Sequence, residues 1–165
     1  SFGAESMDDG DLTRIGRPGA VDETVTAVAQ ARAAGFTNIN LDLMYGLPGQ
    51  SLESWQRTLA NCLTLAPAHL SCYALTVEQE TKLASNIQNQ RSQAPDEGLQ
   101  IQMDEAAQRM LADDGYERYE VSAFAGPVHA AVTMSIIGNS ATIWDWVQVH
   151  TENCLFTTLA YVRSE

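Results

Sequence analysis

The sequence predicts an α/β fold in which helices alternate with the strands of a parallel sheet. Three apolar runs have the composition of buried strands, and a run with helical spacing precedes each of them. The order helix–strand–helix–strand–helix–strand is typical of βα units, whose strands lie parallel in an open sheet or a barrel. With 165 residues, the chain is long enough for one domain with its own core.

A short polar segment leads into the first long helix. Residues 7–16 are predicted to be a brief helix, which Pro18-Gly19 ends. Asp22 then precedes a helical run that Gly35 stops. The residues expected on the core face of this helix are Val21, Val25, Val28 and Ala29.

The stretch from Asn38 to Gln50 reads NINLDLMYGLPGQ and is the most informative in the chain. Residues 38–44 alternate between apolar and polar side chains, which predicts a buried strand with Asp42 near its C-terminal end. A Gly/Pro loop follows, and Ser51 can cap the next helix. In α/β folds ligands bind at this end of the strands, so Asp42 is the first candidate site residue.

Two more strands and two more long helices are predicted beyond residue 50. The first of these helices has an apolar face made of Leu52, Trp55, Leu59, Cys62 and Leu63. Residues 69–77 are the second predicted strand and 116–124 the third. Polar residues 78–95 are expected to be a loop, and Asp96 opens a helix that Gly115 stops. The inner face of that helix is expected to contain Leu99, Met103, Ala106 and Met110.

The charge of the chain excludes several classes of partner. Nine Lys and Arg against 21 Asp and Glu give a formal net charge of -12, which is opposite to the basic footprint of a nucleic-acid-binding protein. There is no basic amphipathic helix for an anionic membrane, no apolar run that could span a bilayer and no signal peptide. We therefore expect a soluble, cytoplasmic protein with no nucleic-acid partner and no integral membrane segment.

The cysteines and histidines do not form a recognisable metal site. Cys62, Cys72 and Cys154 are far apart and odd in number, so neither a disulfide framework nor a metal knuckle is indicated. Cys62 lies on the apolar face of a helix and Cys72 in a strand, and both are expected to pack in the core. His129 and His150 lack spaced partner ligands.

Four segments occur in an order that resembles one protein family. They are Arg17, NLDLMYGLPGQSLESW at 40–55, HLSCYALTVE at 69–78 and GYERYEVSAFA at 115–125. The family is the radical S-adenosylmethionine (radical-SAM) proteins, in the branch like oxygen-independent coproporphyrinogen III oxidase, which includes a heme chaperone. The resemblance implies that residues 1–125 are the C-terminal half of a (β/α) radical-SAM barrel and the αβ elements that follow it.

The resemblance also implies cofactors. In the family a Cys-x-x-x-Cys-x-x-Cys loop holds a [4Fe-4S] cluster, S-adenosylmethionine binds the open iron of that cluster, and porphyrin or heme is a further small-molecule partner. The cluster cysteines, a Gly-rich methionine-binding segment and a Gln lie upstream of Ser1 in the family. The chain is therefore expected to be a fragment, inactive alone and holding none of these cofactors by itself. No catalytic residue and no metal ligand is assigned to it.

Three residues match the positions that bind S-adenosylmethionine in the family. Asp42 matches the acid that hydrogen-bonds the ribose hydroxyls, which suits a carboxylate because it can accept from two neighbouring hydroxyl groups. Arg17 matches a basic residue that helps to hold the same ligand, although the segment between Phe2 and Arg17 is longer than is usual. Thr76 lies where the next strand reaches the cofactor through its backbone. Without the resemblance, Asp42 would be a turn-capping acid and Arg17 a solvated surface residue.

Residues 126–165 are predicted to be an out-of-frame tail. They show no helical period and few turn signals, unlike the rest of the chain. Members of the family follow the FA dipeptide with a segment like RPGxxCRHNxNYWxxGDYLGLGAGAHG. When Gly126 onward is reverse-translated with permitted codons and read from the third base of the first codon, the result is PGPRCRHNVNYWEFGDYLGLGAGAHG. We therefore expect that one base was lost, or two gained, near codon 126, and that Trp144 and Trp146 are accidents of the wrong frame.

Two functions from other classes stay open at the level of sequence. One is a binding module without catalysis that keeps only heme or protein contacts. The other is an unrelated βα-barrel enzyme in which Asp42 is an acid–base group or an Mg²⁺ ligand. Within the radical-SAM interpretation, the fold alone does not decide between coproporphyrinogen oxidation and heme delivery.

Overall fold

The computed structural model describes residues 1–127, and the predicted tail beyond Pro127, with His129, His150 and Cys154, lies outside the described residues. The strands are β1 (Phe2–Glu5), β2 (Asn40–Tyr45), β3 (His69–Ala74), β4 (Glu117–Arg118) and β5 (Ala123–Ala125). The helices are α1 (Asp9–Arg14), α2 (Ala20–Ala33), α3 (Leu52–Thr64), α4 (Lys82–Gln88) and α5 (Glu97–Asp113).

The described strands form one mixed sheet in the order β1-β2-β3-β5-β4. Strands β1, β2 and β3 are parallel, as the alternation with helices predicts. Segment 116–124 does not form the single parallel strand that the sequence predicted, so that prediction was wrong. The segment is a hairpin of β4 and β5, and β5 runs antiparallel to β3. The chain reverses at Glu120, whose carbonyl accepts from the Ala123 amide, in a turn with no Gly or Pro to signal it.

Strand β1 was not predicted from the sequence. It has only four residues, and its pairing with β2 shifts register between Gly3 and Glu5. Such a short, irregular strand carries too little alternation to be recognised, and it takes its conformation from the longer strand beside it. The helix predicted over 7–16 is shorter, Asp9–Arg14, with Asp8 as its N-cap.

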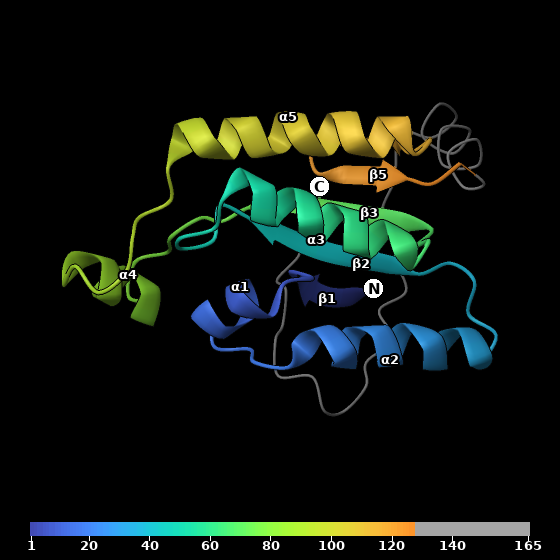
Figure 1. Ribbon diagram of the computed structural model, residues 1–165, viewed down its shortest axis with the longest axis horizontal. Helices are drawn as coiled ribbons and strands as arrows, with labels where there is room; N and C mark the ends of the chain where they lie inside the picture. Colours follow the sequence, from blue (N-terminus) through green and yellow to red (C-terminus); the bar gives the residue numbers. More distant parts are fainter. Residues whose placement is uncertain (128–165) are drawn as a thin grey trace, which may run out of the picture.

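The core lies between the sheet and its helices. Leu41 and Leu43 of β2 are fully buried, as are Trp55 of α3 and Met103 of α5. The Trp55 indole N–H donates to the Met103 carbonyl at 2.8 Å, which joins these two helices. Figure 1 shows α3 and α5 lying alongside each other over the sheet. The predicted inner faces of both helices are confirmed.

Helix ends follow the local signals, but one predicted helix face does not. The Ser51 and Asp96 side chains cap α3 and α5, and Gly35 adopts a positive φ of 93° just after α2. On α2, however, Val25 is 39% exposed and Ala29 is also exposed. Val28 is buried and Val21 packs against the core, as predicted, and the buried face is completed by Ala20 and Thr24 at four-residue spacing from Val28.

The polar segment 78–95 was predicted to be a loop and contains α4. Thr81 caps this helix by accepting from the Ala84 amide at 3.1 Å, yet none of its residues is fully buried. The polar sequence gives no helical pattern of apolar residues, and the helix is defined by its local cap and not by core packing. Among the described helices, none combines the length and apolar character that crossing a bilayer requires.

Candidate cofactor site

The face of β2 opposite the core carries polar side chains. Alternation along β2 buries Leu41, Leu43 and Tyr45 and leaves Asn40, Asp42 and Met44 partly exposed. In the sheet register, Asp42 lies between Gly3 of β1 and Ser71 of β3. We call the side of the sheet that carries Asn40, Asp42 and Ser71 the polar face. Asp42 is the third residue of six in β2, so the prediction that it stands near the C-terminal end was wrong.

The Asp42 carboxylate accepts hydrogen bonds through both of its oxygens. The Ser1 hydroxyl donates to Oδ2 at 2.5 Å, and the Asn40 side-chain amide donates to Oδ1 at 2.8 Å. The same Asn40 amide lies 3.1 Å from the Ser71 hydroxyl oxygen, which ties β2 to β3. The carboxylate is thus oriented along the polar face and accepts a hydroxyl group there.

Arg17 approaches the same face from the loop between α1 and α2. Its guanidinium Nη1 donates to the Gly3 carbonyl at 3.0 Å and forms an ion pair with Glu5 Oε1 at 3.4 Å. Because Gly3 has no side chain, the Glu5 carboxylate can lie over it; a Cβ at position 3 would be 3.1 Å from Glu5 Oε1. Arg17 and Asp42 are therefore brought together through Glu5.

Glu5 is a site residue that the sequence reasoning missed. Burial raises the pKa of its carboxyl group, the positive charge of Arg17 opposes this rise, and the negative charge of Asp42 adds to it. The side chain reaches this position because Glu5 ends β1 at the register shift and has a positive φ of 61°. No signal in the sequence reveals it, because β1 has only four residues and its register with β2 shifts just before Glu5.

Thr76 does not join this cluster. It is exposed and lies two residues beyond the end of β3, whereas the β3 partner of Asp42 is Ser71. Thr76 is five positions further along the chain than Ser71, which in extended backbone corresponds to roughly 16 Å. Among the three predicted site residues, the structure thus brings Asp42 and Arg17 together and leaves Thr76 apart, beyond the C-terminal end of the sheet.

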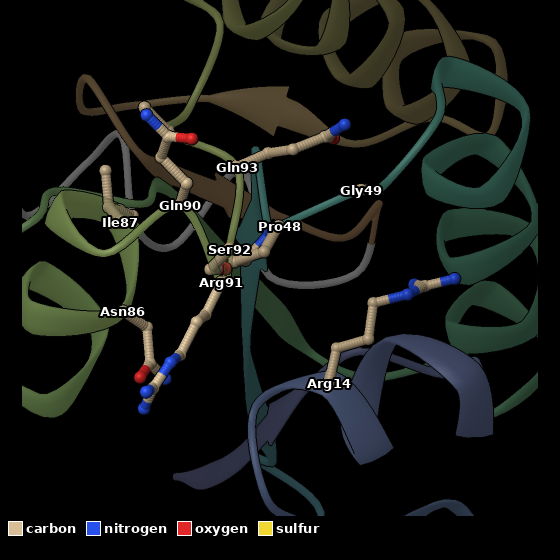
Figure 2. A pocket seen from close by; sticks show the side chains of 10 residues that line it. Arg14, Pro48, Gly49, Asn86, Ile87, Gln90, Arg91, Ser92 and Gln93 are labelled. Carbon is tan, nitrogen blue, oxygen red and sulfur yellow. The ribbon is translucent and has the colours of Figure 1, made fainter.

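A separate hollow of about 770 Å³ lies beside the loop after β2. Arg14, Gly49 and Arg91 line it, together with Pro48 and other residues around the end of α4, namely Asn86, Ile87, Gln90, Ser92, Gln93 and Ala94. Figure 2 shows the guanidinium groups of Arg14 and Arg91 directed away from each other. They form no joint anion clamp, so the polar face is the stronger candidate site.

The described residues do not fit an iron–sulfur cluster. Cys62 and Cys72 are both buried free thiols, on α3 and β3. Burial raises the pKa of Cys62 to about 12 and raises that of Cys72 as well, whereas cluster ligands are thiolates. Their predicted core positions are confirmed. Within 1–127, no group of three or more His, Cys, Asp and Glu side chains is placed to hold a metal ion.

Known proteins resemble this chain in sequence. Radical S-adenosyl methionine domain-containing protein 1, mitochondrial, of Mus musculus is 37% identical over 125 residues, which are 76% of this chain and 28% of that protein. Heme chaperone HemW of Bacillus subtilis is 36% identical over 125 residues, covering 76% of this chain and 33% of its own length. Heme chaperone HemW of Escherichia coli is 37% identical over 127 residues, covering 77% and 32%. The chain is a homologue of the radical-SAM proteins.

A solved structure supports the same relationship. Coproporphyrinogen III oxidase from Escherichia coli, a radical-SAM enzyme, superposes with a TM-score of 0.67 at 25% identity and covers 76% of this chain and 29% of that one. The predicted α/β fold of the radical-SAM type is therefore confirmed. No family model matches the chain. The chain spans about a third of the length of the curated radical-SAM relatives that it matches.

Proposed function

We propose that residues 1–127 are the part of a radical-SAM protein of heme metabolism that binds the ribose of S-adenosylmethionine. The observation that carries the proposal is the hydrogen bond from the Ser1 hydroxyl to Asp42, because a ribose hydroxyl would make the same bond to the same carboxylate. Glu5 offers a second acceptor on the polar face. Arg17 balances the charge of these two acids and keeps Glu5 over Gly3.

The residues present fit the adenosyl ligand but not the cluster. S-adenosylmethionine, together with a [4Fe-4S] cluster, supplies a carbon-centred radical in proteins of this type. In this chain, Asp42 and Glu5 would hold and orient hydroxyl groups, while the buried thiols Cys62 and Cys72 take no part. The chain alone is proposed to be inactive, since none of its described residues can replace the cluster ligands.

Heme delivery is the better proposal within the family. The relatives named heme chaperones are 36% and 37% identical to the chain, whereas the coproporphyrinogen III oxidase structure is 25% identical. Heme or a porphyrin would then be the small-molecule partner of the whole protein. A cytoplasmic location and the lack of nucleic-acid partners stay predictions from charge and sequence.

We also propose that residues 126–165 are translated in a shifted frame. The relatives match over 125 or 127 residues, so a length of chain about equal to that of the tail has no counterpart in them, which supports the proposal. Resequencing the source DNA across codon 126 tests the proposal directly. Restoring one base should open the frame PGPRCRHNVNYW, and a DNA sequence that encodes the chain as given, without such a frame, would contradict it.

The site is tested by binding of S-adenosylmethionine to the protein expressed from the complete, corrected reading frame. Asp42→Asn should weaken binding about tenfold or more, because a hydrogen bond to a charged acceptor contributes about 1.5–3 kcal/mol. Glu105→Gln removes an acidic group from the exposed side of α5 and should leave the affinity unchanged. Anaerobic equilibrium dialysis gives both values. Equal affinity for Asp42→Asn and the wild type would exclude Asp42 from the site.

A further inference from the structure

A buried carboxylate lies outside the candidate site. Asp11 of α1 is fully buried, and its Oδ2 accepts from Gln50 Nε2 at 2.8 Å and from the Ser54 hydroxyl at 3.0 Å. The Ser6 hydroxyl adds a longer bond at 3.4 Å, and Arg14 forms an ion pair with Oδ1. A buried charge is costly unless it is paired and hydrogen-bonded, and Asp11 has partners on both oxygens.

The bond to Asp11 fixes the orientation of the Gln50 side chain. An ionised carboxylate only accepts hydrogen bonds, so the amide nitrogen of Gln50 must face Asp11 and the amide oxygen must face the other way. That oxygen accepts from the backbone amides of Gly46 and Leu47, at 2.9 and 3.3 Å. Asp11 therefore controls, through one side chain, the first two residues of the turn that follows β2.

The turn is linked in the same way to the segment that precedes Thr76. Gly46 has a positive φ of 75°, and the place that a Cβ would take is filled by Gln100 of α5. The Gln100 side-chain amide donates to the Leu75 carbonyl at 3.0 Å, and the Leu75 amide donates to the Tyr45 carbonyl at 2.8 Å. The ends of β2 and β3 are thus held together directly beside the turn.

We propose that Asp11 is a positioning residue for the cofactor site. Through Gln50 it fixes the turn Gly46–Gly49, and through that turn it fixes the chain that leads into Thr76. The inference rests on the proposed function and extends it, because it lets the adenosyl ligand reach from Asp42 on the polar face to the turn and to Thr76 beyond the end of β3. Asp11 is fully buried and hydrogen-bonded to Ser54 and Gln50, so it would act on the site through Gln50.

The first test measures the turn itself, in the full chain. Gln50→Ala should raise hydrogen–deuterium exchange at the Gly46 and Leu47 amides on the order of tenfold, because these two amides lose their acceptor. Exchange at the buried residues Met103 and Leu111 of α5 should not change. Gln102→Ala, an exposed glutamine on α5, is the matched control. Wild-type exchange rates at Gly46 and Leu47 in Gln50→Ala would overturn the inference.

A charge exchange separates positioning from general damage to the fold. Gln50→Glu alone sets two carboxylates against each other and should increase exchange at Gly46 and Leu47. Adding Asp11→Asn restores a donor–acceptor pair, since the Asn amide can donate to the Glu carboxylate while the other Glu oxygen accepts from the turn. Rescue of slow exchange in the double variant is expected. A double variant no better than Gln50→Glu would overturn the inference.

The second test is binding of S-adenosylmethionine to the protein with the complete reading frame. Gln50→Ala should weaken binding about tenfold, and the double variant should bind more tightly than Gln50→Glu. If exchange at the turn rises but the affinity stays the same, while Asp42→Asn still weakens binding, the positioning role is wrong and the proposed function stands. If the wild type itself does not bind, the proposed function fails, and the exchange rates alone decide whether Asp11 holds the turn.

Discussion

At the scale of single residues, the site brings together charged side chains whose proximity could not all be predicted from the sequence. Asp42 could be predicted because a strand pattern surrounds it, and Arg17 because of a family resemblance. Glu5 could not be predicted, since its position depends on a register shift and on the missing side chain of Gly3. The result is an acid that is partly buried between Arg17 and a second acid.

Glu5 should make the stability of the protein depend on pH. Its pKa in the folded state is raised, so the stability that its protonated form provides is present below the ordinary value of 4.5 and is lost as the pH rises through the folded pKa. Glu5→Gln should remove this loss, and its advantage in free energy of unfolding over the wild type should grow from acidic to neutral pH. Urea unfolding at a series of pH values measures the difference. A constant or shrinking difference would contradict the assignment, and Glu105→Gln supplies the reference for an exposed acid.

At the scale of elements, helices with a strong apolar period and a clear cap were predicted well. Helices α3 and α5 have both signals, and their caps and buried faces agree with the sequence. Helix α2 is rich in Ala and Val on several sides, so its period alone did not show which side packs. The hairpin β4–β5 was missed because its direction depends on pairing with β3, a tertiary contact without a local turn signal.

The packing of α3 against α5 should depend on one side chain, Trp55. It is fully buried, its ring centroid lies 5.4 Å from that of Tyr45, and it donates to the Met103 carbonyl. Trp55→Ala should lower the free energy of unfolding by about 3–5 kcal/mol, and Trp55→Phe by about 1–3 kcal/mol because part of the ring and the hydrogen bond are lost. Chemical denaturation measures both. Phe36→Ala, which changes a residue that is 56% exposed, should stay within about 0.5 kcal/mol, and a similar loss there would argue against specific packing of Trp55.

At the scale of the whole molecule, the α/β class was predictable because hydrophobic period and element order agree over most of the chain. The family resemblance also predicted that the chain would cover only part of its relatives, and it spans about a third of those that it matches. At the candidate site, Asp42 and Glu5 come from neighbouring strands, but Thr76 lies beyond the end of a third strand. A ligand that touches all three must therefore extend along the sheet.

The chain as given should not bind heme in a specific way. The segments HNVNYW and GAGAHG, which resemble the family's heme or substrate segments, appear only in the proposed corrected frame. Titration of the purified chain with hemin should give no saturable shift of the Soret band, whereas the protein from the corrected, complete reading frame should give one. A tight, stoichiometric shift with the uncorrected chain would show that residues 1–165 suffice for heme binding. It would contradict the expectation that specific heme binding needs the corrected frame.

Position 46 restricts how this sequence can vary over evolutionary time. A methyl group on Gly46 would lie 2.5 Å from Gln100 Nε2, and the positive φ of this residue would strain any other L-amino acid. A smaller residue at position 100 would relieve the collision but would release the Leu75 carbonyl. A single mutation at position 46 therefore creates a collision with Gln100, and a single mutation at position 100 removes the donor to the Leu75 carbonyl. Homologues that keep this turn should therefore retain both glycine at position 46 and glutamine at position 100.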